Sequence, residues 1–325
     1  MSAVSAVSVP PALPAAMQAA VLDGTLGRIG FACVEVPTPG PGEILVKVAA
    51  CGLCHSDLHI VDGDWALPKS PLVPGHEIIG TVAALGAGVE TPAVGTTVGV
   101  AWLGSACGDC AACRDGMEQI CPNKAMTGFS RDGGFAEYVV ATAAFAVTLP
   151  ATVDAAALAP VLCAGLTAYR GLKRADLRPG QTVAIVGAGG LGHLGIQYAR
   201  TMGLRVVAVD VSAEKLALAK RLGAAVTVDA TVGDAAAAVR EATSGGAHAV
   251  LVTAPSRRAA EAAVEMLRPG GTCVFVGLPN DGDSLDVSIS GLSGRERTIR
   301  GSNIGSREDL REAVGSALAG DVAAV

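Results

Sequence analysis

The stretch TVAIVGAGGLG, residues 182–192, decides the fold of this chain of 325 residues. Its first five residues are apolar or β-branched, which is typical of a buried strand, and a helical pattern follows through Ile196 and Ala199. The glycines between them have the spacing G-x-G-x-x-G. A lone match to this pattern is weak evidence. Between a strand and a helix it becomes strong evidence, because the glycines let a pyrophosphate group approach the helix N-terminus. We therefore expect a dinucleotide-binding turn made by Gly187, Gly189, Gly190, Leu191 and Gly192.

The second half of the chain repeats this alternation of strand and helix. Short apolar runs of strand length are separated by alanine-rich stretches of helical length, such as 212–222 and 256–267. Such alternation is typical of a parallel sheet with helices on both faces. We expect an α/β fold with a doubly wound, Rossmann-type sheet, whose strands lie at 182–186, 205–209, 225–228, 249–253 and 272–276.

The first half of the chain is predicted to be rich in β-strands, which are separated by clusters of Gly and Pro. The predicted strands are 43–50, 78–85, 97–102 and 136–140. The pattern changes near residues 150–160. We therefore predict one domain over 17–160, a second over 161–305, and a last segment, 306–325, that begins with a helix at 307–318. Residues 1–16 carry no charged side chain and are expected to be a flexible extension, with Met17 as an alternative start.

Composition excludes several classes of function. The net charge of −6 and the pI near 5.4 argue against nucleic-acid and anionic-membrane partners. No uninterrupted apolar run approaches the roughly 20 residues that cross a bilayer. Nine cysteines in so long a chain fit reduced thiols that bind metal in a cytoplasmic protein better than a disulfide framework. Only five Phe, three Tyr and two Trp are present, so the core is expected to consist of small aliphatic side chains.

Four of the cysteines form one cluster, with the spacing C-x2-C-x2-C-x7-C. Four thiolates at such intervals can surround one zinc ion and leave no position open, which makes the site structural rather than chemical. We predict a structural zinc lobe at about 104–122, bound by Cys107, Cys110, Cys113 and Cys121.

A second, open zinc site is predicted from Cys54, His76 and Cys163. Two cysteines and one histidine leave the fourth zinc position free for a substrate. The three residues lie far apart in the sequence, so their spacing proves nothing, and each alone is more often a packed core residue.

Asp210 follows the predicted strand 205–209 and bears on the choice of cofactor. A carboxylate there accepts hydrogen bonds from ribose hydroxyls and repels a 2′-phosphate, which favours NAD over NADP. The alternative is an ordinary acid near the start of the next helix.

Seven stretches together resemble the zinc-dependent medium-chain alcohol dehydrogenases. They occur in the order of that family, from about Met17 to the end of the chain: 54–59 (CHSDLH), 63–65 (GDW), 74–77 (PGHE), 107–121, 133–138 (GGFAEY), 163–167 (CAGLT) and 187–192 (GAGGLG). The resemblance implies a GroES-like catalytic domain in front of the Rossmann domain. It also implies two zinc ions per chain, with Cys54 rather than Cys51 as a ligand.

The resemblance assigns further roles around the metal. Asp57 is expected to orient the imidazole of His76, and Glu77 either tunes the metal site or is simply a buried, paired carboxylate. Ser56 would take the alcohol proton and pass it through a ribose hydroxyl to His59 at the surface. The alternatives are a turn residue at Ser56 and a solvated side chain at His59. Trp65 and Trp102 are expected to narrow the substrate pocket, unless both simply fill the core.

Cofactor contacts follow from the same resemblance. Lys215 matches a ribose contact, and His55 and Thr167 match positions near the pyrophosphate and the nicotinamide; Val276 and Ile304 complete the expected NAD site. The expected activity is hydride transfer between NAD and a small primary alcohol or aldehyde, by a homo-oligomer, either a dimer or a tetramer.

One feature departs from the family. Members usually continue with a helix and a strand that return to the first domain, and with a Gly-Arg pair whose arginine meets the pyrophosphate. The sequence here reaches only Val325. Segment 306–325 is therefore expected to be a truncated return segment, and a non-catalytic or impaired zinc-binding member of the family is the alternative.

Overall fold

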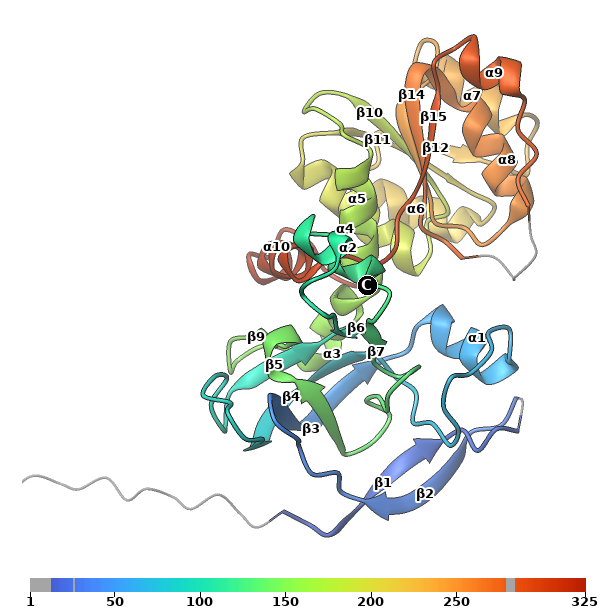
Figure 1. The fold of residues 1–325 in the computed structure, drawn as a ribbon. Helices are drawn as coiled ribbons and strands as arrows, with labels where there is room; N and C mark the ends of the chain where they lie inside the picture. The colour runs from blue at the N-terminus through green and yellow to red at the C-terminus, as the bar shows by residue number, and fades with distance from the viewer. Residues whose placement is uncertain (1–12, 26, 279–283) are drawn as a thin grey trace, which may run out of the picture.

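The computed structural model describes residues 13–25, 27–278 and 284–325 (Figure 1). Most of the predicted extension, residues 1–12, lies outside this part. Residue 16 does not belong to an extension, because it begins strand β1 (Ala16–Val21), which pairs antiparallel with β2 (Gly30–Glu35).

Six parallel strands form one sheet in the order β12-β11-β10-β13-β14-β15, which is the Rossmann order counted from β10. All five predicted strands are present, and the doubly wound fold is confirmed. The sixth, β15, was not predicted, because this short edge strand follows a run of charged residues that reads as surface. The strands are β10 (Thr182–Val186), β11 (Arg205–Asp210), β12 (Val226–Asp229), β13 (Ala247–Val252), β14 (Leu267–Phe275) and β15 (Thr298–Gly301).

The sheet is covered on both faces because the side chains of each strand alternate. Val183 and Ile185 of β10 pack in a core with α4, α5 and α6, whereas Ala184 and Val186 pack in a second core with α7 and α8. Both cores consist mainly of Ala, Val, Leu and Ile, as the scarcity of aromatic residues predicts. The helices are α4 (Ala164–Arg174), α5 (Gly190–Thr201), α6 (Ala213–Arg221), α7 (Ala235–Ala242), α8 (Arg257–Glu265) and α9 (Ile289–Ser293).

The β-rich half forms a five-stranded antiparallel sheet in the order β8-β3-β4-β5-β9. The predicted strand 136–140 is displaced toward the C-terminus, because Ala136 forms a bridge with Ala19 of β1 and only β8 pairs with β3. A separate pair, β6 and β7, precedes and follows the cysteine segment. The strands are β3 (Glu43–Gly52), β4 (Glu77–Leu85), β5 (Thr97–Val100), β6 (Leu103–Ser105), β7 (Ala125–Met126), β8 (Tyr138–Thr142) and β9 (Val147–Thr148).

Between β9 of the antiparallel sheet and β10 of the parallel sheet, the chain forms three consecutive helices, α3, η3 and α4. Figure 1 shows α10 (Arg307–Leu318) between the two sheets, beside the segment that carries α2 (Ala111–Arg114). One hydrophobic core joins Ile79 of the β-rich half to Leu162 and Val314, so a domain division near residue 160 stays a prediction. The remaining helices are α1 (His55–Asp62), η1 (Glu118–Ile120), η2 (Ala143–Phe145), α3 (Ala155–Leu158) and η3 (Ala159–Leu162).

Among the residues that the structure describes, no single helix has the length and apolar character needed to cross a membrane. One bent pair of helices, Ala155–Leu162 with Ala164–Arg174, reaches that threshold jointly, by length and composition alone.

Candidate active site

The three residues predicted to form the open zinc site come together in the structure. The Sγ atoms of Cys54 and Cys163 are 3.8 Å apart, and Nε2 of His76 lies 3.3 Å from the Cys163 sulfur. Together with a carboxylate oxygen of Glu77, these four ligand atoms lie within 4.8 Å of one another. Two thiolates and an imidazole at such separations can bind one zinc ion and leave a position for a further ligand.

Local structure explains how Cys54 and His76 reach this point. Cys54 is the N-cap residue of α1, and Oδ2 of Asp57 accepts a hydrogen bond from its backbone N–H at 2.8 Å. The other oxygen, Oδ1, lies 3.2 Å from Nδ1 of His76. Asp57 is 1% exposed. A single buried carboxylate thus fixes both the start of the helix and the imidazole, whose Nε2 faces the sulfur of Cys163.

The electrostatics of this cluster favour a cation. The contact with Cys163 lowers the pKa of the Cys54 thiol to about 4, and the same contact together with burial raises the pKa of Cys163. Burial alone would lower the pKa of His76, but Asp57 and Cys54 outweigh it and raise that pKa to about 10. Since the groups around the imidazole are acidic, a bound cation would balance their charge, and the soft sulfur donors suit zinc. The residues present therefore fit the expected metal.

Glu77 stands at the edge of the same cluster. Burial, and then the charge of Cys54, raise the pKa of its carboxyl group to about 7. A Cβ atom at Gly52 would collide with this carboxylate, so the glycine makes room for it. Its position is compatible with both expected roles, and the choice between them stays a prediction.

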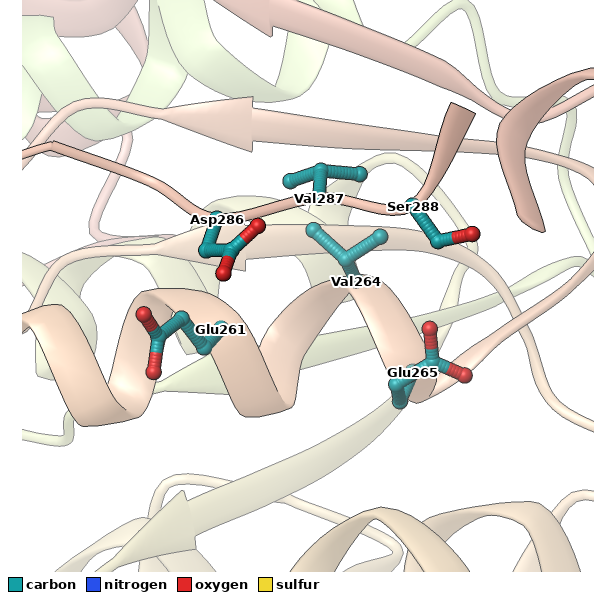
Figure 2. A pocket seen from close by; sticks show the side chains of 6 residues that line it. All are labelled: Glu261, Val264, Glu265, Asp286, Val287 and Ser288. Atoms are coloured by element: carbon teal, nitrogen blue, oxygen red, sulfur yellow. The ribbon is translucent and has the colours of Figure 1, made fainter. Parts of the chain in front are cut away.

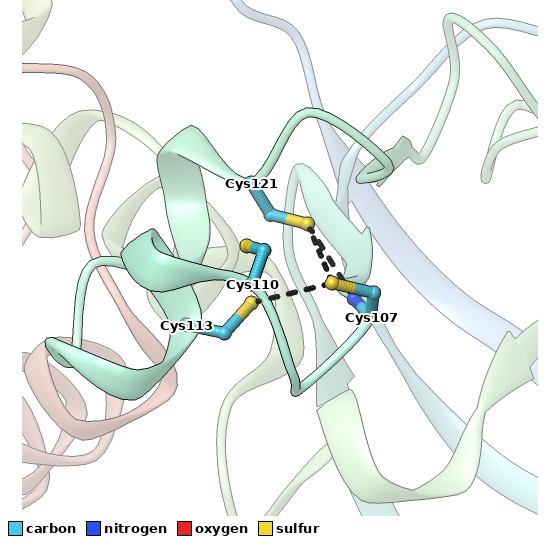
Figure 3. A group of neighbouring side chains, drawn as sticks. All are labelled: Cys107, Cys110, Cys113 and Cys121. Atoms are coloured by element: carbon cyan, nitrogen blue, oxygen red, sulfur yellow. Dashed lines mark hydrogen bonds between the residues drawn. The ribbon is translucent and has the colours of Figure 1, made fainter.

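The four-cysteine segment also converges on one point. Figure 3 shows the four sulfur atoms directed toward one another, and all lie within 4.8 Å. Cys107 Sγ is 3.5 Å from Cys121 Sγ and 4.0 Å from Cys113 Sγ. Backbone N–H groups of Cys107 and Asn123 donate hydrogen bonds to the Cys121 sulfur, which favours its thiolate form. This donor set is complete without a further ligand and fits a structural zinc ion.

Aromatic rings form one wall beside the open metal site. The ring of Trp102 lies edge-on to His76 at 4.9 Å between centroids, and Trp65 lies edge-on to Trp102 at 6.3 Å. Phe129, which the sequence analysis missed, stacks on Trp102 at 5.7 Å and meets Trp65 at 6.1 Å. In a chain with so few aromatic residues, three rings in contact next to a metal site suit a pocket wall. The same rings also belong to a small hydrophobic core with Leu22, Ile60 and Leu72.

The predicted surface position of His59 is wrong. Its side chain is 6% exposed, because Trp65 stacks on the ring at 5.0 Å and His55 meets it edge-on at 4.8 Å. Its Nδ1 lies 2.6 Å from Oδ2 of Asp64, while Nε2 is buried and has no hydrogen-bond partner among the described residues. A buried nitrogen without a protein partner fits a hydroxyl of a bound cofactor. Ser56, in the same helix, is half-buried.

The glycine-rich turn connects β10 to α5 as expected. Gly187 has a φ of 95°, and a Cβ atom at Gly192 would collide with the carbonyl of Gly187, so the helix can approach the strand only without a side chain there. Asp210, at the end of β11, holds the turn: its Oδ2 accepts a hydrogen bond from Ala188 N–H at 2.6 Å, and its Oδ1 accepts one from Ser212 N–H at 2.9 Å. Asp210 thus lies between the glycine-rich turn and the start of α6, and its expected contact with a cofactor ribose stays a prediction.

The other predicted cofactor residues come from both halves of the chain. Thr167 is buried one turn after Cys163 in α4, and its N–H donates to the Cys163 carbonyl at 2.8 Å. Val276 follows β14, and Ile304 packs in the same hydrophobic core as Cys163. Lys215 is exposed in α6, close to Gly189, and His55 is exposed at the start of α1.

Two surface pockets lie apart from these clusters. Figure 2 shows one of about 280 Å³ beside α8, with the carboxylates of Glu261, Glu265 and Asp286 around it. The other, of about 400 Å³, lies between the β1–β2 pair and β8. Neither contains a predicted site residue.

Comparison with known proteins gives consistent matches over most of the chain. The family profile "Alcohol dehydrogenase GroES-like domain" matches residues 40–151, and the profile "Zinc-binding dehydrogenase" matches residues 190–319. An alcohol dehydrogenase from Moraxella sp. (strain TAE123) is 49% identical over 309 residues, which cover 95% of this chain and 90% of that relative.

Solved structures of dehydrogenases have a similar fold. The alcohol dehydrogenase from the hyperthermophilic archaeon Aeropyrum pernix has a TM-score of 0.87 and 35% identity, covering 95% of this chain and 91% of that one. A protein assigned as a zinc-binding dehydrogenase from Sinorhizobium meliloti 1021, bound to NADP, has a TM-score of 0.87 and 31% identity, with coverage of 95% and 90%.

Proposed function

We propose that this chain, which belongs to the family of zinc-type medium-chain alcohol dehydrogenases, transfers a hydride between NAD and small primary alcohols or aldehydes. The observation that carries the proposal is the convergence of Cys54, His76 and Cys163 from three distant segments, next to the ring of Trp102. A protein that kept the fold only as a scaffold would need neither an open ligand set nor a pocket wall beside it.

Cys54, His76 and Cys163 would hold the catalytic zinc, and the four-cysteine lobe would hold a structural one, which makes two ions per chain. Zinc in the open site would supply Lewis acidity, which lowers the pKa of the substrate hydroxyl. Asp57 contributes by keeping the hydrogen of His76 on Nδ1, so that Nε2 remains free to bind metal. Glu77 lies close enough to adjust the charge of the ligand set.

The cofactor would lie across the carboxyl ends of the parallel strands, with its pyrophosphate at the N-terminus of α5. A nicotinamide ring held there would supply the acceptor or donor of the hydride. Asp210 supports NAD over NADP, because its buried carboxylate is held in place by two backbone N–H groups and would repel a 2′-phosphate. The Sinorhizobium meliloti protein binds NADP, so the preference of this chain rests on Asp210 and is decided by assay.

Proton transfer would use the first helix. Ser56 lies two residues after the proposed ligand Cys54 and is partly exposed. His59 lies about one turn further along, and its Nε2 has no hydrogen-bond partner among the described residues. Ser56 would take the proton of the substrate hydroxyl, and Nε2 of His59, which is buried, would receive it. A ribose hydroxyl of the cofactor would supply the link between the two residues.

The aromatic wall supports a preference for small substrates. Trp65, Trp102 and Phe129 contact one another beside His76, and large rings there leave little room for a branched alcohol. Assembly into a dimer or tetramer and a cytoplasmic location stay predictions.

The deciding experiment is a zinc count combined with an assay of ethanol oxidation, with NAD and with NADP. We expect two zinc ions per chain and faster turnover with NAD. Cys163→Ala should remove one ion and abolish turnover. Cys273→Ala, which replaces a buried cysteine outside both clusters, is the matched control and should keep both ions and the activity. Two bound zinc ions without any alcohol or aldehyde turnover would reject the proposed activity.

A further inference from the structure

The turn after α1 folds back onto His59. Gly63 ends the helix with a φ of 78°, and its N–H donates to the carbonyl of His59. The N–H of Asp64 donates to the same carbonyl at 3.0 Å. Because residue 63 adopts a left-handed conformation that favours glycine, the chain reverses at once and returns to the last turn of the helix.

This reversal places the next two side chains on the His59 ring. Oδ2 of Asp64 lies 2.6 Å from Nδ1, a length typical of a charge-assisted hydrogen bond. Trp65 stacks on the ring with an angle of 28° between the planes. In this turn, Asp64 therefore contacts the edge of the imidazole and Trp65 contacts its face. His55 lies edge-on to the same ring.

The carboxylate also decides which nitrogen carries hydrogen. An ionised carboxylate can only accept hydrogen bonds, so the hydrogen of a neutral His59 is held on Nδ1. Nε2 then keeps its lone pair. This atom is buried and has no hydrogen-bond partner in the described part of the chain, so the nitrogen that keeps its lone pair is also the one that forms no hydrogen bond with the protein.

We infer that Asp64 is a positioning residue for proton transfer: it fixes His59 in the tautomer whose Nε2 accepts the proton released by the substrate. The inference rests on the proposed function, because it assigns Asp64 to the proton path of that reaction. Asp64 acts through His59 and not on the substrate. Its own side chain is 34% exposed, so it also connects the buried imidazole to solvent.

The test compares Asp64→Asn with Asp62→Asn in the zinc-loaded protein. Both variants remove one negative charge near the C-terminal end of α1, but Asp62 is exposed, and among the described residues no hydrogen bond or ion pair joins its side chain to His59. We expect Asp64→Asn to lower kcat for alcohol oxidation roughly 10- to 100-fold, by analogy with partners that orient metal-binding imidazoles. The KM for the alcohol should change little, and Asp62→Asn should match the wild type.

A second readout needs no turnover. In protein labelled with ¹⁵N-histidine, whose five imidazoles are resolved by difference from His59→Gln, the wild type should show His59 with hydrogen on Nδ1 and a bare Nε2. Asp64→Asn should give a mixture of the two tautomers, because an amide can donate as well as accept. A merely structural role of Asp64 would not change the tautomer.

The kinetic and NMR measurements together distinguish a failure of the proposed function from a failure of the role assigned to Asp64. If the wild type oxidises no alcohol, the proposed function fails alone, and the NMR spectra still decide whether Asp64 sets the tautomer. If the wild type is active and Asp64→Asn equals Asp62→Asn in kcat and in its spectrum, the role of Asp64 is overturned.

Discussion

Arg307, the first residue of α10, binds Glu118 in the cysteine lobe across 189 residues of sequence. Its Nε lies 3.0 Å from both carboxylate oxygens, Nη2 lies 2.8 Å from Oε2, and its backbone N–H donates to Oε1 at 2.7 Å. The guanidinium also lies 4.3 Å from the centre of the Phe145 ring. One arginine thus joins the cysteine lobe and the β-rich half to the last helix.

A second set of ion pairs joins α10 to α4, the helix that follows Cys163. Asp309, one turn into α10 and 1% exposed, accepts a hydrogen bond from Arg170 at 2.8 Å and pairs with Lys173 at 2.9 Å. Both partners belong to α4, the helix that follows Cys163. Charge contacts on α10 therefore link the cysteine lobe, through Arg307, and α4, the helix that follows a proposed zinc ligand, through Asp309.

Glu118→Gln should destabilise the protein by about 1 kcal/mol, because the pair with Arg307 is partly exposed to solvent. Burial raises the pKa of Glu118, but the hydrogen bonds and charge of Arg307 outweigh it and hold that pKa below its usual value. A carboxyl group with a lowered pKa stabilises the fold above its unfolded pKa of about 4.3 and loses this effect as the pH falls through its folded pKa. Unfolding temperatures of the variant and the wild type should differ most near pH 7 and converge below about pH 4. Glu308→Gln, which affects only an exposed pair with Arg311, is the control, and a constant difference at all pH values would contradict the expectation.

Loss of the proposed structural zinc should weaken the contact between Arg307 and Glu118 as well. Cys113→Ser removes one of four ligands, so we expect one zinc ion per chain instead of two and a lower unfolding temperature. Because Glu118 lies in the same lobe, the effects of Cys113→Ser and Glu118→Gln should not add in the double variant. Metal analysis and thermal unfolding of the three variants measure this, and strictly additive effects would show that the lobe and the Arg307 contact are independent.

His59→Gln should reduce turnover mainly near and below neutral pH, where few hydroxide ions are available to take the proton instead. Added imidazole should partly restore the rate, because an external base can replace the missing one. The measurement is the pH profile of kcat with and without imidazole. A profile of unchanged shape would remove His59 from the proton path.

Asp210→Ser tests the choice of cofactor. A hydrogen bond from a ribose hydroxyl to the buried Asp210 carboxylate would be worth about 2–3 kcal/mol. Its loss should therefore lower the preference for NAD over NADP in kcat/KM by on the order of 100-fold. The backbone N–H groups of Ala188 and Ser212 also lose their acceptor, and the unfolding temperature should fall as well. Asp229→Ser, in the neighbouring strand β12, changes the same charge and should leave the preference intact. An unaltered NAD/NADP ratio in Asp210→Ser would place the selectivity elsewhere.

Sequence patterns predicted the Rossmann sheet because buried parallel strands and glycine turns are local features. The strand Thr182–Val186 and the helix Arg307–Leu318 have the predicted bounds, and the α/β fold is confirmed. The edge strand β15 escaped prediction because an exposed strand beside charged residues lacks an apolar signature. Cys54, His76 and Cys163 could be grouped by their ligand chemistry and by the resemblance, but not by spacing, since their separation in the sequence carries no geometric signal.

Contacts between distant side chains were beyond local patterns. The burial of His59 depends on Trp65 closing over it, and nothing in the spacing of the helix indicates that closure. Phe129 and the Arg307–Glu118 pair are contacts of the same kind. The motif GDW did contain a usable signal: a glycine that ends a helix directly before Asp64 implies that the aspartate returns to the last helical turn.

The aromatic wall provides the last test. Trp102→Ala removes the ring that contacts both His76 and Phe129, so the space beside the open metal site should widen. We expect kcat/KM for a bulky secondary alcohol to rise relative to that for ethanol, by roughly 10-fold or more, since one or two methylene groups of steric discrimination are worth about 1–3 kcal/mol. Phe31→Ala, which removes an 87% exposed ring on β2, should leave this ratio unchanged. If Trp102→Ala lowers the unfolding temperature and leaves the ratio of the two alcohols as it was, the ring fills the core and does not shape the pocket.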